Sequence, residues 1–303
     1  MTAKRVDYLL FFLLAAMWGG SFVAIKFVVT DFPPVFGAML RVAVALLVLG
    51  AVFSAQRRSL SVPAALRRRM WLAGFFSQGL PFCLLFWGER KISPGLAGII
   101  NGTVPIWAFI LGRFTPQRES LSTRKLLGLG LGLAGIAVIF YPLIAFSGTR
   151  DEALGASAVV LMAVSYAVGS LLSRTLLAGH KADFRANVFH QHCASLAVLV
   201  ATSASLESWP SASTMLASPP AIVSVLYLGI FSTAAAFMIY FHLIREWGAV
   251  RASAVTYVAP VVALFWDFVF FRNLPGPSVW LGVGAILSGV VLLHEPATKV
   301  AKN

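Results

Sequence analysis

Apolar residues run along this chain in long stretches, separated by short breaks that carry charges, prolines or glycines. Each stretch is close to the roughly 20 residues that an α-helix needs to cross a bilayer. No connection between two stretches is long enough to hold a further domain. The pattern predicts an all-α polytopic membrane protein with ten transmembrane helices, at residues 7–29, 34–54, 69–89, 94–113, 124–142, 153–174, 185–205, 219–244, 250–271 and 277–294.

Composition strengthens this prediction. Apolar residues make up 59% of the 303 positions and charged residues only 12%, against about 25% charge in an ordinary soluble domain. This balance excludes a soluble globular fold. The two cysteines, Cys83 and Cys193, each lie within an apolar stretch. We therefore expect buried thiols and not a disulfide framework.

The basic residues indicate how the helices are oriented. The chain has 24 Lys and Arg and a net charge of +13. With ten crossings, 18 of the 24 fall on the side that holds both termini, and 4 fall on the other side. Because Lys and Arg collect on the cytoplasmic side, we expect a bacterial-type inner (plasma) membrane protein with both termini in the cytoplasm. Orientation and the anionic inner leaflet then account for the basic excess, and no nucleic-acid partner is expected.

The second half of the chain resembles the first. The segment Phe82–Phe109 aligns without gaps on Phe237–Leu264, at an offset of 155 residues, and a glycine-rich pattern one helix later repeats at an offset of 154. Apolar helices look alike by chance, but two nearly equal offsets favour an internal duplication. We predict two five-helix repeats, at residues 1–149 and 150–303.

A repeat of five helices has a geometric consequence. An odd number of crossings places the start of the second repeat on the opposite membrane face, so the two halves are inverted. Inverted repeats with a site between them, near the bilayer midplane, are typical of secondary transporters. The pattern therefore predicts a transporter that works by alternating access.

Several motifs coincide with those of one transporter family. The first helix ends in WGGSFVAIK (Trp18–Lys26), the second contains Pro34 and Arg41, and the fifth and tenth helices are rich in glycine. Over essentially the whole chain, this pattern resembles the EamA-type branch of the drug/metabolite transporter (DMT) superfamily. The resemblance implies ten helices in two inverted five-helix repeats. The chain is also similar to YddG-like exporters of aromatic and other amino acids, which implies amino acid export.

Polar and aromatic residues that recur in both halves indicate a substrate cavity. Gln78 and Phe82 lie one turn apart in the third helix, and Thr233 and Phe237 repeat that spacing in the eighth. Such stripes also occur in ordinary helix packing, and that alternative stays open. Aromatic walls with neutral hydrogen-bonding groups suit a small amphipathic solute. The predicted substrate-binding residues are Trp18, Ser21, Phe22, Gln78, Phe82, Asn101, Tyr166, Ser170, Thr233, Phe237 and Thr256.

Ionisable residues near or within the spans are candidates for gating or coupling. These are Lys26, Arg41, His242 and Asp267. Snorkelling of the long side chain to the headgroups is the alternative for Lys26. We expect Arg41 to face protein, paired with backbone carbonyls or with Asp267, as a gate or a structural strut.

Two prolines are candidate hinges. Pro105 and Pro260 each lie in the middle of a predicted span. Because proline lacks an N–H, it leaves the carbonyl four residues earlier without its helical donor. The carbonyls of Asn101 and Thr256 could then bind a ligand or permit bending, and an ordinary kink stays open as the alternative.

Three histidines keep two other functions open. His190, His192 and His242 have suitable side chains for proton coupling, so broad drug or metabolite proton antiport is one alternative. An intramembrane histidine-dependent enzyme is another. His190 and His192 point about 200° apart on a helix, so no shared metal ion is expected. Without a nucleotide-binding or catalytic motif, we expect no enzyme and no cofactor. The expected partners are a small-molecule substrate and membrane lipid, and a monomer is compatible with the pattern.

Overall fold

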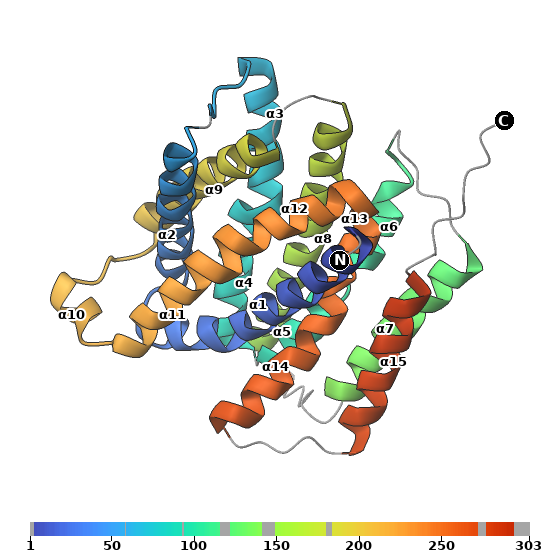
Figure 1. The fold of residues 1–303 in the computed structure, drawn as a ribbon. Coiled ribbons are helices and arrows are strands. Elements are labelled where there is room, and N and C mark those ends of the chain that lie inside the picture. The colour runs from blue at the N-terminus through green and yellow to red at the C-terminus, as the bar shows by residue number, and fades with distance from the viewer. Residues whose placement is uncertain are drawn as a thin grey trace.

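The computed structural model describes residues 3–57, 59–92, 94–115, 122–140, 149–179, 184–271 and 277–293. Over these residues the chain forms helices joined by turns and short connections, without a strand (Figure 1). The elements are α1 (Ala3–Asp31), α2 (Pro34–Ala55), α3 (Ala64–Gly74), η1 (Phe75–Gly79), α4 (Leu80–Lys91), α5 (Pro94–Asn101), α6 (Val104–Gly112), α7 (Thr123–Phe140), α8 (Arg150–Gly179), α9 (Phe184–Leu206), α10 (Ala212–Leu216), α11 (Pro219–Gly229), η3 (Ile230–Ala235), α12 (Ala236–Trp247), α13 (Ala249–Ser253), α14 (Val255–Phe271) and α15 (Pro277–Leu293).

Every predicted apolar segment coincides with one helix or with a run of consecutive helices. The third segment begins at Ala64 and not at residue 69, because the arginines before Met70 end an apolar stretch without ending a helix. Five segments of the described chain are long and apolar enough to cross a bilayer by length and composition. They are Arg5–Asp31, Pro34–Ala55, Ala64–Lys91, Arg150–Leu176 and Pro219–Trp247.

Each half of the chain has a π-helical turn in its third apolar segment. These turns are η1 (Phe75–Gly79) and η3 (Ile230–Ala235). Their first residues, Phe75 and Ile230, are separated by the same offset of 155 that aligns the two sequence halves. Because π-helical turns are rare and are frequent at functional sites, this recurrence is much more specific than a similarity in apolar composition.

The predicted hinge in the first half is a break between two helices. Helix α5 ends at Asn101 and α6 begins at Val104, with a turn over residues 102–103 between them. Pro105 therefore lies in the first turn of α6, where its missing N–H leaves no helical bond unmade. A kink within one continuous helix, the alternative to a hinge, is therefore not seen at Pro105, and the hinge itself stays a prediction.

The second half is interrupted at a slightly different point. Helix α13 ends at Ser253 and α14 begins at Val255, so the break falls at Ala254. Pro260 then lies inside α14, as expected for a kink-forming proline. As a result, Asn101 is the last residue of α5 and Thr256 is the second residue of α14, and both lie beside a helix break.

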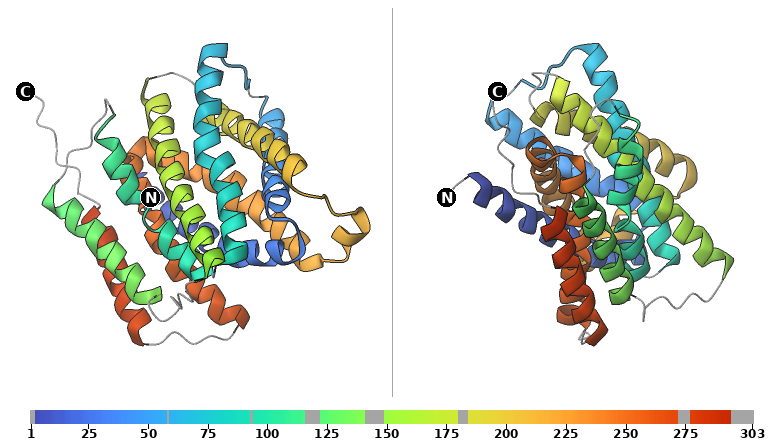
Figure 2. Two further views of the ribbon diagram at one scale, coloured as in Figure 1. Left: turned by 180° about the vertical axis from the view of Figure 1, so that it is seen from behind. Right: turned by 90° about the vertical axis from the view of Figure 1, so that its right-hand side faces the viewer.

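Helices α7 and α15 lie side by side on one flank of the molecule (Figures 1 and 2). A Cβ atom added at Gly135 would lie 2.6 Å from the carbonyl oxygen of Gly282, and one added at Gly289 would lie 2.7 Å from that of Gly128. Such glycines let two helix backbones approach closely. The later glycine of each helix meets the earlier glycine of the other, so the two helices run antiparallel.

Helices α2 and α9 make matching contacts with the opposite half of the chain. Helix α2 packs on α11 and η3, and α9 packs on α3 and η1. A Cβ added at Gly229 would lie 2.9 Å from the carbonyl oxygen of Arg41, and one added at Gly74 would lie 2.4 Å from that of Gln191. Gly74 and Gly229 are again 155 residues apart. The two halves therefore meet through glycines at equivalent positions.

Candidate substrate-binding site

A cavity lies between the two halves, and its walls come from helices of both. It is bounded by α1, α2, η1 and α4, by α5 and α6 at their break, and by α8, α12 and α14. Its lining residues are Trp18, Ser21, Phe22, Arg41, Ser77, Phe82, Leu85, Asn101, Val104, Tyr166, Ser170, Phe237, Tyr240, Phe241 and Thr256.

The cavity is small in this conformation. The space open to the centres of water-sized molecules is about 50 Å³, compared with the roughly 150 Å³ of a cavity that accommodates benzene. Its walls must therefore move apart before a solute the size of an amino acid can enter. The helix breaks next to Asn101 and Thr256 lie at this wall, where a change in backbone angle would alter the cavity.

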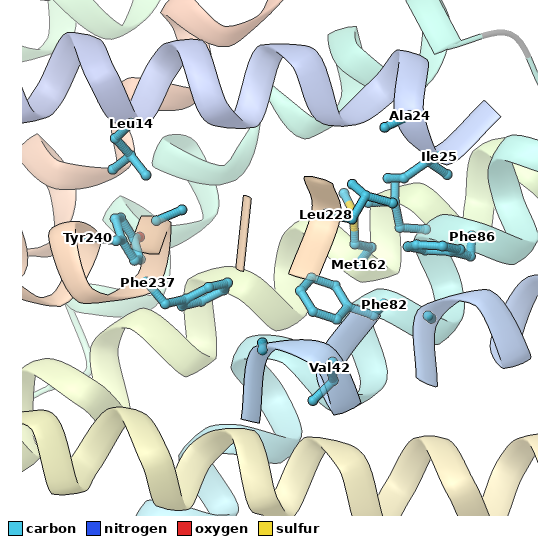
Figure 3. Packing of buried hydrophobic residues seen from close by; sticks show 14 of the residues in the cluster. Leu14, Ala24, Ile25, Val42, Phe82, Phe86, Met162, Leu228, Phe237 and Tyr240 are labelled. Atoms are coloured by element: carbon cyan, nitrogen blue, oxygen red, sulfur yellow. The ribbon is translucent and has the colours of Figure 1, made fainter. Parts of the chain in front are cut away.

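Aromatic residues make up seven of the fifteen residues in the lining. The ring centroids of Phe82 and Phe237 are 6.3 Å apart, and those of Trp18 and Tyr240 are 5.0 Å apart. Tyr166 packs edge-on against Phe82 at 6.5 Å. Figure 3 shows Phe237 between Tyr240 and Phe82, with Leu14 of α1 near Tyr240. Tilted and edge-on rings of this kind are well suited to a solute that has a ring or an apolar chain.

Arg41 contributes a guanidinium group to this apolar wall. The side chain is only 3% exposed. Its Nε donates a hydrogen bond to the hydroxyl of Thr233 at 2.6 Å, and its Nη2 donates to the carbonyl oxygen of Ser232 at 3.1 Å. The guanidinium carbon lies 4.2 Å from the centroid of the Phe82 ring. The expected pairing with carbonyl oxygens is confirmed by the bond to Ser232.

The opposite π-helical turn has a neutral counterpart to this contact. Gln191 of α9 accepts a hydrogen bond from the hydroxyl of Ser77 at 2.7 Å, and its amide nitrogen donates to Ser173 and Asn187, each at 3.0 Å. Ser77 and Ser232 are equivalent at the 155-residue offset. Each π-helical turn is thus held by a polar side chain of a helix from the other half, and only one of these side chains is charged.

Most of the predicted substrate-binding residues come together. Nine of them line the cavity, namely Trp18, Ser21, Phe22, Phe82, Asn101, Tyr166, Ser170, Phe237 and Thr256. Gln78 and Thr233 are not among the lining residues. Thr233 is fully buried and holds Arg41, and Gln78 is fully buried with neither amide atom hydrogen-bonded to a described residue.

Apart from Arg41, five lining residues are absent from the predicted list of substrate-binding residues, namely Ser77, Leu85, Val104, Tyr240 and Phe241. Leu85 and Tyr240 each lie three residues after a predicted wall residue, Phe82 and Phe237, so helical spacing could have indicated them. Ser77 could not be found in this way, because the π-helical turn changes which side chains share a face. Arg41 was predicted as a gate or strut, and the structure places it in the cavity lining.

Two of the other charged candidates, Lys26 and His242, are not among the residues that line the cavity. The ammonium group of Lys26 donates to the carbonyl oxygen of Glu89 at 3.5 Å. Nε2 of His242 lies 2.9 Å from a carboxylate oxygen of Asp7, near the start of α1. Asp267 lies on α14, and its side chain is outside the part of the chain that the structure describes. The predicted pairing of Arg41 with Asp267 therefore stays a prediction.

Glu89 is a buried acid that sequence reasoning placed at the very end of a span. It is fully buried, and neither carboxylate oxygen has a hydrogen-bond partner among the described residues. Lys26 and Arg41 attract this carboxylate electrostatically. Glu89 does not line the cavity, so a solute in the cavity would meet Arg41 and not Glu89.

The histidines are spread over the molecule. The ring of His190 lies 2.8 Å from the carbonyl oxygen of Leu60, and His192 bonds the carbonyl of Val188 at 2.8 Å within α9. None of His190, His192 and His242 is in the cavity lining. Among the residues that the structure describes, no group of three His, Cys, Asp or Glu side chains comes together that could hold a metal ion.

Comparisons with known proteins agree with the geometry of the bundle. The model of the EamA-like transporter family matches residues 6–141 and again residues 153–294. The transporter YoaV of Bacillus subtilis is 25% identical over 277 residues, which cover 91% of this chain and 92% of YoaV. The inner membrane transporter YedA of Escherichia coli K12 is 26% identical over 286 residues, which cover 93% of this chain and 88% of YedA.

A solved crystal structure shares the fold. It superposes with a TM-score of 0.76 and 21% sequence identity, covering 95% of this chain and 98% of the other. At this identity the likeness concerns the arrangement of the helices alone. Together with the two family matches, it accounts for nearly the whole length of the chain.

Proposed function

Because this chain belongs to the EamA-like transporter family of the DMT superfamily, we propose that it is a secondary transporter of small amphipathic metabolites. Aromatic and other amino acids are the proposed solutes, and export by alternating access is the proposed mode. The observation that carries this proposal is the cavity between the halves, since a largely apolar pocket with a few polar groups is the usual form of a small-molecule site.

The proposed architecture is two inverted five-helix repeats, at 1–149 and 150–303. The reciprocal contact of Gly135 with Gly282 and of Gly289 with Gly128 supports it, because a two-fold relation exchanges equivalent residues in this way. The antiparallel course of α7 and α15 puts such an axis across the helices and so in the plane of the membrane. Exchange of conformations between halves related in this way would open the cavity to each side in turn.

The proposed location is a bacterial-type inner membrane, with both termini in the cytoplasm. The excess of Lys and Arg on the side of the termini supports this orientation. The similarity to the inner membrane transporter YedA supports the choice of membrane.

Uptake into proteoliposomes tests the function. We expect labelled phenylalanine, tryptophan and leucine to enter vesicles that contain the purified protein faster than vesicles without it. Uptake that requires a pH gradient would favour the proton-antiport alternative, and uptake without one would favour facilitated exchange. If no amino acid of a full panel enters under either condition, amino acid transport is contradicted.

A matched pair of phenylalanines provides the control. Phe237→Ala removes part of the cavity wall, and we expect it to lower uptake by about tenfold. Phe231→Ala changes a side chain that is 49% exposed on the same helical run and outside the cavity lining, and we expect uptake to be unchanged.

A further inference from the structure

The cavity lining contains one charged side chain among its described residues, and that side chain is Arg41. Every other lining residue is apolar, aromatic or a neutral hydrogen-bonding residue. A cation within the membrane is costly, and such residues commonly mark the path of a substrate or ion. The lining therefore contains a positive group with no acidic side chain facing the same space.

The guanidinium group is held on one edge and on one face. Thr233 and Ser232 accept hydrogen bonds from Nε and Nη2, and the ring of Phe82 lies against it at 4.2 Å. The remaining terminal nitrogen, Nη1, makes no hydrogen bond to the described residues, and Arg41 forms no salt bridge with them. A guanidinium fixed in this way, in the lining of the cavity, keeps the Nη1 donors without a partner among the described residues, and such donors favour carboxylate binding.

The arrangement of charged groups around Arg41 is compatible with binding of an anionic ligand in the cavity. Glu89 attracts Arg41 electrostatically but is fully buried and outside the lining. Lys26 lies beside Glu89 and adds a second positive charge on that side. The hydroxyl groups of Tyr166 and Tyr240 are neutral, and that of Tyr240 shares a hydrogen bond with Ser170. No described lining residue offers a carboxylate to a solute ammonium group.

We propose that Arg41 binds the carboxylate of the transported solute, while the ring of the solute packs among Trp18, Tyr166 and Phe237. The substrate class is then molecules with a free carboxylate and an aromatic or apolar body, and the carboxylate matters more than the amino group. This inference rests on the proposed transport function and names the chemistry that its site selects.

Binding of a matched series to protein in lipid nanodiscs tests the inference. The probes are 3-phenylpropanoate, 3-phenylpropanamide and 3-phenylpropylamine, which share one carbon skeleton and differ in charge. We expect isothermal titration to show the acid binding about tenfold or more tightly than the amide and the amine. Equal binding of acid and amide, tighter binding of the amine, or no binding of the acid would overturn the inference.

Variants test whether the preference for the acid depends on Arg41 itself or on the net charge of the protein. Arg41→Gln should reduce the preference for the acid over the amide to within about twofold. Arg41→Lys keeps a charge and should retain part of the preference, and it replaces Arg41→Gln if that variant does not fold. The control Arg68→Gln removes an exposed charge on α3 and should leave the preference unchanged. A preference that persists in Arg41→Gln overturns the role of Arg41.

Uptake measured in parallel distinguishes the two proposals. Amino acid uptake without any preference for the carboxylate would overturn the inference on Arg41 and leave the transport function standing. Preferential binding of the acid without uptake of any amino acid would contradict amino acid transport and support the anion site.

Discussion

Two buried glutamines on the η1 side of the structure are in opposite situations. Gln191 is bonded to Ser77, Ser173 and Asn187, so its amide joins three helical elements. Gln78 is one residue from Ser77, and neither atom of its amide is bonded to a described residue. A buried polar group that forms hydrogen bonds stabilises the fold. A buried polar group without them is destabilising, because it has lost its hydrogen bonds to water.

This difference predicts opposite effects of the same substitution. Gln191→Leu leaves buried partners without hydrogen bonds, and we expect it to lower the free energy of unfolding by about 2 kcal/mol. Gln78→Leu replaces an unbonded buried amide by a side chain of similar size, and we expect no loss of stability or a small gain. Thermal unfolding of both variants in detergent measures the difference, and an equal loss in the two would contradict it.

For individual residues, the sequence predicted the aromatic residues of the cavity wall better than the polar contacts of the site. Aromatic residues at helical spacing, such as Phe82 and Phe237, turn toward the cavity because the helix period alone decides their direction. The hydrogen-bond partners of Arg41 and Gln191 depend on the π-helical turns and on which helices contact each other. Residue spacing in the sequence predicts neither of these features. For that reason Thr233 was expected in the lining and instead holds Arg41.

Helices α7 and α15, one from each half of the chain, contact each other through glycines at equivalent positions. Gly128 and Gly289 meet at one end and Gly135 and Gly282 at the other. Other glycines of the same helices, such as Gly130, would meet nothing within 4 Å if a Cβ were added. Within one turn of α7, Gly128 therefore lies at the contact with α15, whereas Gly130 faces open space.

Alanine substitutions separate these roles. Gly289→Ala pushes a methyl group into the backbone of α7, and we expect it to cost about 1–3 kcal/mol of stability. Gly130→Ala adds a methyl group in open space and should stabilise its helix by up to about 1 kcal/mol. Equilibrium unfolding in mixed micelles compares the two variants, and a tolerated Gly289→Ala would show that the helices do not meet as described.

The positions of the helices were largely predictable, and their interruptions were not. The length of an apolar stretch predicts the length of its helix, because a membrane-spanning helix must face lipid or other helices along its whole length. The break after Asn101 follows from turn residues that the apolar pattern does not separate from the helix. The break at Ala254 has no proline or glycine beside it, and the hydroxyl of Thr256 donates a hydrogen bond across it to the carbonyl oxygen of Ser253 at 2.8 Å.

Across the whole molecule, both halves of the chain contribute helices to one cavity. The sequence predicted two similar halves from their offset, and the family model also matches the chain twice. What the sequence could not supply is the size of the space between them, which depends on how closely α1, α4, α8 and α12 pack. In this conformation the cavity is small, and it must widen for a solute to enter.

Counterflow in proteoliposomes measures directly whether solutes cross the membrane through this cavity. Vesicles preloaded with unlabelled phenylalanine should accelerate entry of the labelled amino acid, because a single site alternates between the two faces. Val104→Trp fills the cavity and should reduce this exchange by about tenfold or more, whereas Val291→Trp, at an exposed position of α15, should leave it unchanged. Undiminished exchange in a correctly folded Val104→Trp variant would contradict transport through this cavity.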